Sequence, residues 1–419
     1  MSLSPEQITI IKATVPVLAE HGKTVTSLFY KNVLNDNPAL RNIFSHTHQE
    51  SGHQAAALAR SLYLYASHIE DLSALKDLVE LVAHKHASLY VLPEHYPIVG
   101  KYLLAALKTT LGDACTPEIL DAWGAAYQQL ADILIGRESQ LYNTTAGWTD
   151  WRSFRITKKV PESEQITSFY LEPVDKAHLP LPAHRPGQYI GLRTEVAELG
   201  VLQPRQYSLS DMHHPDHFRI SVKKELALDP SQTDLRSHPG FVSNILHDEK
   251  KEGDEVMVSH PYGDFYLDAD QEAAASPLVL LSAGVGLTPM VAILNALNSR
   301  SSTRPVSFIH GAHTSKIRAF GDHVQNTAKS MDNVNVVFFN STVSEDDKQG
   351  EHYDHIGRAD LKKLDEKKHL FLDDKSTHYF VCGPSSFMTD MDTALKQYGV
   401  DSERVHLERF GTGGIDRAV

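Results

Sequence analysis

Apolar residues recur three and four positions apart through roughly the first 142 residues, where glycines are few. This is the period of an α-helix that buries one face. The chain also begins with a helix-start pattern, in which Ser4 caps, Pro5 takes the first helical position and Gln7 completes a capping box. The pattern predicts an all-α domain, which we place at residues 1–146.

A stretch of turn residues at 143–151 ends this period, and short runs rich in Val, Ile, Tyr and Phe follow. Runs at 165–171, 188–192 and 217–223 read as strands separated by Pro, Gly and Asp clusters. Strands at this spacing are typical of a small antiparallel β-barrel. We place this second domain at residues 151–268.

From Pro277 onward strands alternate with helices. An apolar strand at 278–282 leads through a glycine turn into a helix at 289–297, and such alternation predicts a parallel α/β sheet. This third domain is expected at residues 273–419, so the fold class is multidomain: all-α, then an antiparallel barrel, then a parallel sheet. The remaining expected strands lie at 306–310, 334–339, 378–382 and 404–408.

Composition narrows the class of partner. The 419 residues carry a formal net charge of −13, and this acidic excess argues against nucleic acid and anionic membrane surfaces. No run of about 18 apolar residues and no export signal is present, so we expect a cytoplasmic protein with no obligate membrane contact. Cys115 and Cys382 are the two cysteines, too few for a disulfide framework or a cysteine-based metal site.

One histidine among 24 stands on an apolar helical stripe. The stripe between residues 75 and 90 includes Leu78 and Val82, and His86 continues it four residues later, whereas His84 falls off it. An imidazole that faces a helical core is either a satisfied core histidine or a metal ligand.

Two further polar residues share faces with apolar ones. Gln54 lies on one face with Leu58, and Tyr30 lies beside Val33 and Leu34. Buried polar groups need partners. The spacing alone leaves open whether Tyr30 and Gln54 bond each other, bond the backbone, or serve a site.

Several short segments follow one another in the first domain: Leu28-Phe29-Tyr30, Asn37-Pro38, Ile43-Phe44, Gln54 with Leu58, Lys85-His86-Ala87-Ser88 and Tyr96-Pro97-Ile98-Val99-Gly100. Taken in this order, they resemble the globin domain of the flavohaemoglobins. The resemblance implies that His86 is the proximal ligand of a haem b iron and that Tyr30 and Gln54 hydrogen-bond the distal ligand. It places Tyr96 and Glu138 behind the imidazole; without it, Glu138 beside Arg137 reads as an exposed helical charge. Phe44, Leu58, Lys85 and Val99 would line the haem.

The resemblance continues through the barrel. Arg205-Gln206-Tyr207-Ser208 matches a flavin-binding string, and on an extended strand Arg205 and Tyr207 point the same way, a cation for phosphate and a ring for stacking. Gly240, Val242 and Ser243 match a pyrophosphate turn at a helix start. The FAD contacts implied are Tyr189, Arg205, Gln206, Tyr207, Ser208, Gly240, Val242, Ser243, Glu408, Phe410 and Gly411.

A glycine turn after the strand at 278–282 has the strand–turn–helix context that dinucleotide binding requires. A second turn follows the strand at 378–382. Lys316 and Arg318 leave NADH and NADPH equally open, since either side chain meets a 2′-phosphate or faces water. The NAD(P) contacts implied are Gly284, Val285, Gly286, Leu287, Thr288, Pro289, Cys382, Gly383 and Pro384.

The resemblance to the flavohaemoglobins implies a nitric oxide dioxygenase that turns nitric oxide and dioxygen into nitrate, with electrons passed from NAD(P)H through FAD to haem, in a monomer. It also implies that Lys85 and Glu408 influence redox potentials. Departures from the family are Thr412 in place of Pro, the tail at 413–419 and a longer loop at 226–239. Alternative functions are an oxygen or redox sensor, and a haem-assisted hydroperoxide reductase or NAD(P)H oxidase.

Overall fold

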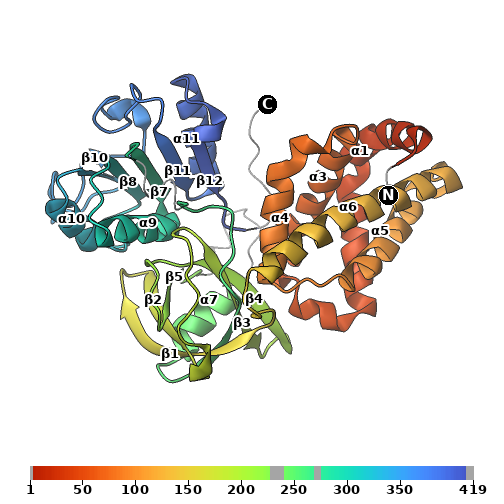
Figure 1. The fold of residues 1–419 in the computed structure, drawn as a ribbon, viewed down its shortest axis with the longest axis horizontal. Coiled ribbons are helices and arrows are strands. Elements are labelled where there is room, and N and C mark those ends of the chain that lie inside the picture. Colours follow the sequence, from red (N-terminus) through yellow and green to blue (C-terminus); the bar gives the residue numbers. More distant parts are fainter. Residues whose placement is uncertain (1–2, 227–239, 269–274, 412–419) are drawn as a thin grey trace.

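The computed structural model describes residues 3–226, 240–268 and 275–411. The departures expected at 227–239 and 412–419 therefore lie outside the described residues. Three lobes follow one another along the chain, a helical domain and two sheet domains (Figure 1). The predicted fold class is confirmed. None of the helices in the described ranges is both long and apolar enough to cross a membrane.

The helical domain buries an Ala- and Leu-rich core between long helices. The predicted capping box starts α1, where Gln7 N donates to Ser4 Oγ and Ser4 N donates to the Gln7 side chain. Phe29 and Val33 of α1 are almost fully buried. The elements are α1 (Pro5–Asp36), η1 (Pro38–Asn42), α2 (His46–Glu50), α3 (His53–Ser67), η2 (Leu72–Leu75), α4 (Lys76–Ser88), α5 (His95–Leu111), η3 (Gly112–Ala114) and α6 (Pro117–Asn143).

The second domain is an antiparallel sheet with strand order β4-β3-β6-β1-β2-β5. An isolated antiparallel bridge between Leu209 and Ile220 brings the two outer strands together, as the barrel prediction requires. The elements are β1 (Arg152–Pro161), β2 (Ile166–Pro173), η4 (Lys176–His178), β3 (Tyr189–Val196), β4 (Val201–Ser208), β5 (Phe218–Lys223), α7 (Phe241–Asn244), the π-helical turn η5 (Ile245–Glu249) and β6 (Glu255–Val258).

The third domain is a parallel sheet with strand order β10-β9-β8-β7-β11-β12. Its central strand β7 is buried on both faces: Leu278 and Leu280 pack with α9, whereas Val279 and Leu281 pack with α11. The elements are β7 (Leu278–Ala283), η6 (Gly284–Gly286), α9 (Leu287–Ser299), β8 (Val306–Ala312), α10 (Gly321–Ser330), β9 (Val334–Asn340), β10 (His355–Ile356), η7 (Leu361–Lys363), β11 (His378–Cys382), α11 (Ser385–Gln397), η8 (Ser402–Arg404) and β12 (Val405–Glu408).

A buried histidine makes this domain acid-sensitive. His310 of β8 is 1% exposed, and its Nδ1 lies 2.9 Å from Ser282 Oγ. Burial, together with the smaller effect of the Arg318 charge, lowers the pKa of His310 to about 3. In the unfolded chain His310 has an ordinary histidine pKa near 6.5. Between the two pKa values it therefore binds a proton in the unfolded chain but not in the folded domain. The free energy of unfolding therefore keeps its full value above about pH 6.5, and His310 lowers it as the pH drops toward 3.

We expect His310→Gln to flatten this pH dependence. Between pH 7 and pH 4.5, the wild-type protein should lose on the order of 1–2 kcal/mol more unfolding free energy than the variant. Urea transitions followed by circular dichroism at the two pH values measure the loss. His313→Gln, at an exposed position just after the same strand, is the control. Equal pH dependence in wild type and His310→Gln would contradict the assignment.

Candidate functional site

His86 lies in the last turn of α4 and is held from behind by two side chains. Its Nδ1 lies 2.8 Å from Glu138 Oε1 and 3.1 Å from the Tyr96 hydroxyl, which itself donates to Glu138 Oε1 at 2.5 Å. Because the carboxylate accepts, the proton belongs on Nδ1 and the lone pair on Nε2. No residue in the described part of the chain bonds Nε2, and the His86 side chain is 33% exposed.

Glu138 is not the exposed helical charge that its neighbour Arg137 suggests. Its exposed fraction is 2%, so the reading from residues alone is wrong. The arginine turns the other way and forms an ion pair with Glu80 of α4, with its Nε 2.7 Å from Glu80 Oε1. Burial and the adjacent Glu138 raise the pKa of Tyr96, which keeps its phenol protonated and donating.

The second group of predicted residues comes from α1, α3, α5 and the segment between η1 and α2. Tyr30 is buried, and burial raises its pKa while a hydrogen bond with Gln54 partly offsets the rise. Gln54 Oε1 accepts from Gln49 Nε2 at 2.6 Å. The ring of Phe44 meets that of Tyr30 edge to face, with centroids 5.5 Å apart. Leu58, Phe44 and Val99 are only partly buried apolar residues against this core.

The face of α4 that lacks the apolar stripe is buried as well. His84 is 7% exposed, and Gly263 N donates to its Nδ1 at 3.0 Å. Ser88 Oγ accepts from Gln206 Nε2 at 2.8 Å, so Gln206, a predicted FAD contact, is turned toward the helical domain. Figure 1 shows α4 on the side of its domain that faces the sheets. Sequence periodicity within the helix carries no signal for this, because the covering groups come from another domain.

A residue that the sequence analysis missed joins the same two domains. Gln203 of β4 is fully buried, its Oε1 accepts from His46 N at 2.8 Å, and its Nε2 donates to Arg41 O at 2.9 Å. Next to it, Leu202 N donates to Asn42 Oδ1 at 2.9 Å. These bonds hold the backbone on both sides of Phe44.

We expect Gln203→Leu to loosen that segment. Leucine has about the size and shape of the glutamine side chain, but two backbone groups of residues 41–46 lose their hydrogen-bond partners. Each loss costs about 1–3 kcal/mol of stability where the group stays buried. Hydrogen exchange of peptides spanning residues 37–50 should accelerate, whereas exchange in α5 should not. Gln128→Leu, which removes an exposed bond to Asp132, is the control. Unchanged exchange at 37–50 would show that the glutamine does not hold the segment.

The predicted flavin string presents a cation with no carboxylate partner. Arg205 donates to Pro204 O at 2.7 Å and to Thr47 Oγ1 at 3.1 Å, and no carboxylate within the described ranges pairs with it. Burial lowers its pKa. Ser208 Oγ is buried and has no hydrogen-bond partner among the described residues. A half-buried cation and a buried, orphaned hydroxyl on one strand are what an anionic ligand satisfies.

The remaining predicted contacts surround this strand. Tyr189 of β3 is buried, and burial raises the pKa of its phenol. Gly240 precedes α7, and a Cβ there would lie 2.7 Å from Ser243 Oγ, so a larger residue would displace the neighbouring side chains. Val242 is 1% exposed, whereas Phe410 is 42% exposed beyond β12.

A charged cluster forms where the domains meet. Lys85 of α4 donates to the carbonyl of Gly411, just beyond β12. Burial raises the pKa of Glu408 to about 8, and nearby Asp264 adds to the rise while Lys85 opposes it. Burial lowers the pKa of Lys85. The predicted residues Lys85, Glu408 and Gly411 thus lie together although more than 320 positions separate Lys85 from the other two.

The two predicted glycine turns also meet. They follow β7 and β11, which are neighbours in the sheet where the strand order reverses. A Cβ on Gly286 would lie 2.3 Å from the carbonyl oxygen of Cys382, and Gly284 has a φ of +56°. Dinucleotides bind at such reversal points in α/β sheets. Helix α9 starts at Leu287, two residues before the predicted start, so Thr288 and Pro289 belong to its first turn.

The two cations considered for a 2′-phosphate differ in placement. Arg318 is buried, with its guanidinium 3.9 Å from the centre of the Phe338 ring and 3.2 Å from Asn340 Oδ1. Lys316 is exposed. Arg318 therefore does not face water, one of the two alternatives considered for it; it supports the sheet from within.

Comparisons with known proteins agree with this arrangement. The Globin family model matches residues 27–134, and the oxidoreductase NAD-binding domain model matches residues 280–393. The chain is 47% identical over 418 residues to the flavohemoprotein of Bordetella pertussis, covering 99% of this chain and 100% of that protein. The flavohemoprotein of Deinococcus radiodurans is 45% identical, with 98% and 97% covered.

Solved structures give the same result. The crystal structure of flavohemoglobin from Malassezia yamatoensis with bound FAD and heme matches with a TM-score of 0.84 at 30% identity, covering 98% of this chain and 100% of that one. The FAD/NAD binding domain of a nitric oxide dioxygenase from Vibrio cholerae matches with a TM-score of 0.53 at 31% identity, covering 62% of this chain and 99% of that one.

Proposed function

This chain belongs to the flavohemoprotein family, and from that premise we propose that it is a nitric oxide dioxygenase. The reaction converts nitric oxide and dioxygen to nitrate with electrons from NAD(P)H. The observation that carries the proposal is the His86 imidazole, which is bonded to Glu138 through Nδ1 and keeps Nε2 for a ligand bond. The domains would be residues 1–146 for haem b, 151–268 for FAD and 273–419 for NAD(P)H. We further propose that it acts as a cytoplasmic monomer.

The residues present fit all three cofactors. His86 would hold the haem iron, Arg205 and Ser208 offer a cation and a hydroxyl to FAD phosphate and ring, and the turns at Gly286 and Gly383 allow the close approach of a dinucleotide. When bound, the nicotinamide supplies a hydride, the flavin divides it into single electrons, and the haem iron is where dioxygen and nitric oxide react. The proposal assigns Tyr207, Tyr189 and Gly240 to the flavin as well.

The residues behind the His86 imidazole act on it electrostatically. Glu138 accepts the Nδ1 proton of His86 in a hydrogen bond, which makes Nε2 a stronger electron donor and fixes the ring orientation. The Tyr96 hydroxyl donates to the same oxygen and holds the carboxylate in place. The proximal side is therefore built to favour oxygen chemistry over simple carriage.

On the other side the chain offers neutral donors. The raised pKa of Tyr30 keeps its phenol protonated at neutral pH, so it donates without adding charge. Gln54 is the second donor, and Phe44, Leu58 and Val99 exclude water. Lys85 of the proposed haem domain and Glu408 of the proposed NAD(P)H domain lie together where the domains meet, and we propose that their charges influence electron transfer.

Counting nitrate tests the proposal. Full-length protein loaded with haem and FAD should form one nitrate per nitric oxide in the presence of dioxygen, with steady consumption of NAD(P)H. Slow turnover without nitrate would favour an oxygen or redox sensor. Rapid NAD(P)H consumption without nitrate, or with reduction of an added hydroperoxide, would favour an oxidase or hydroperoxide reductase.

Tyr30→Phe should speed release of dioxygen from the reduced protein. Removing one hydrogen bond to a charged acceptor costs roughly 1.5–3 kcal/mol, which is about a 10- to 100-fold faster release. Stopped-flow absorption of the dithionite-reduced protein measures the rate. Tyr102→Phe is the matched control, since that hydroxyl donates to Asp36 at the surface. An unchanged release rate would remove Tyr30 from the proposed role.

A further inference from the structure

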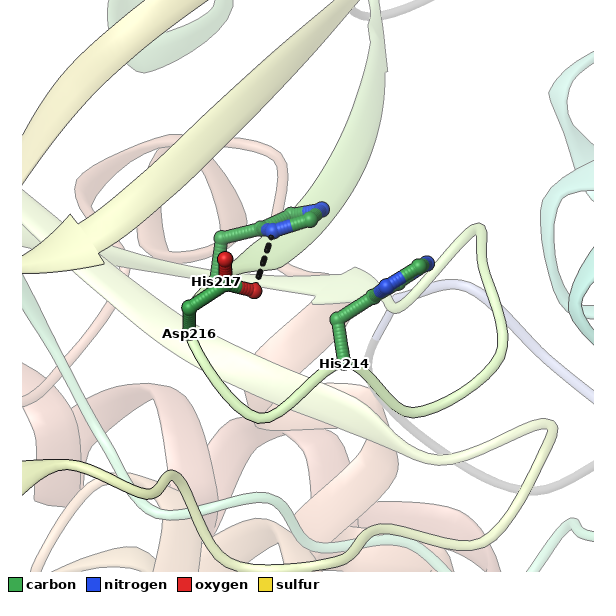
Figure 2. Close-up of side chains that lie close together, drawn as sticks. All are labelled: His214, Asp216 and His217. Atoms are coloured by element: carbon green, nitrogen blue, oxygen red, sulfur yellow. Dashed lines mark hydrogen bonds and ion pairs between the residues drawn. The ribbon is translucent and has the colours of Figure 1, made fainter.

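A cluster of metal-ligating side chains lies outside the sites described so far. The turn between β4 and β5 carries His214, Asp216 and His217, and Figure 2 shows the two imidazoles beside the carboxylate. One ring nitrogen of each histidine and one carboxylate oxygen all lie within 4.8 Å of one another. This is the one group of three or more such residues found in the described part of the chain. The proposed function does not use it.

Packing and a backbone hydrogen bond hold the two imidazoles and the turn that carries them. The two imidazoles stack with centroids 4.5 Å apart and planes 19° from parallel, and His217 also packs on the Tyr170 ring at 5.4 Å. Asp216 Oδ1 accepts from His217 Nδ1 at 2.9 Å. Between the two histidines, the carbonyl of Pro215 accepts from Leu181 N at 2.7 Å, which fastens the turn to the barrel.

A second carboxylate lies behind one of the rings. His214 Nε2 is 3.8 Å from Asp211 Oδ2. Asp211 is itself anchored, by Arg219 Nη1 at 3.1 Å and by Asn295 Nδ2 at 2.7 Å. A carboxylate behind a ligating imidazole orients the ring and increases its basicity, and such partners are a regular part of protein metal sites.

We propose that His214, Asp216 and His217 bind a zinc ion. Two imidazoles and one carboxylate are donors that Zn²⁺ accepts, with water in the fourth tetrahedral position. Bonds of about 2.0–2.2 Å around a tetrahedral ion require the donor atoms to lie roughly 3.3–3.6 Å apart. Small rotations of the side chains close the present spacing, and Asp216, whose side chain is 65% exposed, is free to make the largest one.

The proposed zinc site also affects the contact between the barrel and the parallel-sheet domain. Asp211 links the turn to α9, the helix that follows the first glycine turn, through Asn295. The side-chain Oδ1 of Asn295 in turn lies 2.7 Å from His323 Nε2 of α10. A zinc ion on His214 therefore stiffens the contact between the barrel and the parallel-sheet domain.

Equilibrium dialysis of the full-length holoprotein against Zn²⁺, without an affinity tag, tests the site. Zinc and iron are counted by elemental analysis, so that haem iron gives the protein concentration. Wild type should hold one more zinc equivalent than the His214→Ala/His217→Ala double variant. Asp216→Asn should weaken that equivalent at least tenfold. His213→Gln is the control, because the neighbouring His213 ring packs against His184 instead and should leave binding unchanged.

Haem and flavin absorption show whether each variant is folded. If the double variant does not fold, the comparison of Asp216→Asn with wild type is the test. Equal zinc content in wild type and the folded double variant would overturn the proposal. So would loss of the same equivalent in His213→Gln, since the ion would then lie elsewhere. Nitrate formation is measured separately, so failure of the zinc site leaves the proposed function untouched.

Discussion

His86→Ala should leave the purified protein with FAD but without stably bound haem. In the described part of the chain the imidazole Nε2 is unbonded while Nδ1 is tied to Glu138, so the alanine variant has no axial ligand to offer. The Soret band relative to the flavin band in absorption spectra measures the loss, which should be nearly complete. His53→Ala, at an exposed position at the start of α3, should keep the wild-type ratio.

Added imidazole separates lost ligation from misfolding. In the His86→Ala variant a free imidazole should restore part of the Soret band, because it replaces the missing ring. A variant that cannot be rescued but also lacks helical circular dichroism has simply failed to fold, and Glu138→Gln then serves instead, with a shifted haem reduction potential as its readout. A normal haem spectrum in His86→Ala would exclude His86 as the ligand.

Gly286→Ala should abolish rapid reduction by NAD(P)H. The added Cβ would lie 2.3 Å from Cys382 O and 2.7 Å from Gly383 N, which are backbone atoms that cannot swing aside. The two turns must therefore separate, and a displacement of about 1 Å in a reacting pair costs roughly 100-fold in rate. Anaerobic stopped-flow reduction of the flavin measures it, while dithionite should still reduce both cofactors.

Gly311→Ala is the matched control for that experiment. It lies on β8 of the same sheet, and its Cβ would meet Ala359 Cβ at an ordinary 3.6 Å. Its reduction rate should stay within about twofold of wild type, because an unstrained surface contact changes little. Wild-type reduction rates in Gly286→Ala would show that the meeting of the two turns is not needed for nicotinamide access.

Local patterns carried most of the fold. The apolar run at 278–282 predicted a strand of a parallel α/β sheet, and β7 is that strand, buried on both faces because α9 and α11 cover it. The two-residue strand β10 was not predicted, since a pair such as His355-Ile356 has no periodicity to detect. Where boundaries moved, they moved by one to four residues, because capping and pairing, rather than hydropathy, decide them.

Local patterns predict some residues of the candidate site but not others. His86 is visible from its own helix, because an imidazole on an apolar stripe is unusual. Glu138 and Gln203 are not, since what buries each is a segment 52 or about 160 positions away in the chain. Nothing in a lone sequence distinguishes a buried amide that fastens two domains from one that faces water. The histidine turn after β4 was likewise overlooked, because its spacing follows no helix or strand.

Helix α4 carries important side chains on two opposite sides. One side carries His86, and the other carries His84 and Ser88, which bond groups of the barrel domain. A chimaera that replaces residues 1–146 with the corresponding part of a distant relative thus inherits a foreign outer surface together with the new imidazole. Grafting succeeds only if both sides travel as a matched set, so the two halves of this protein are constrained to diverge together.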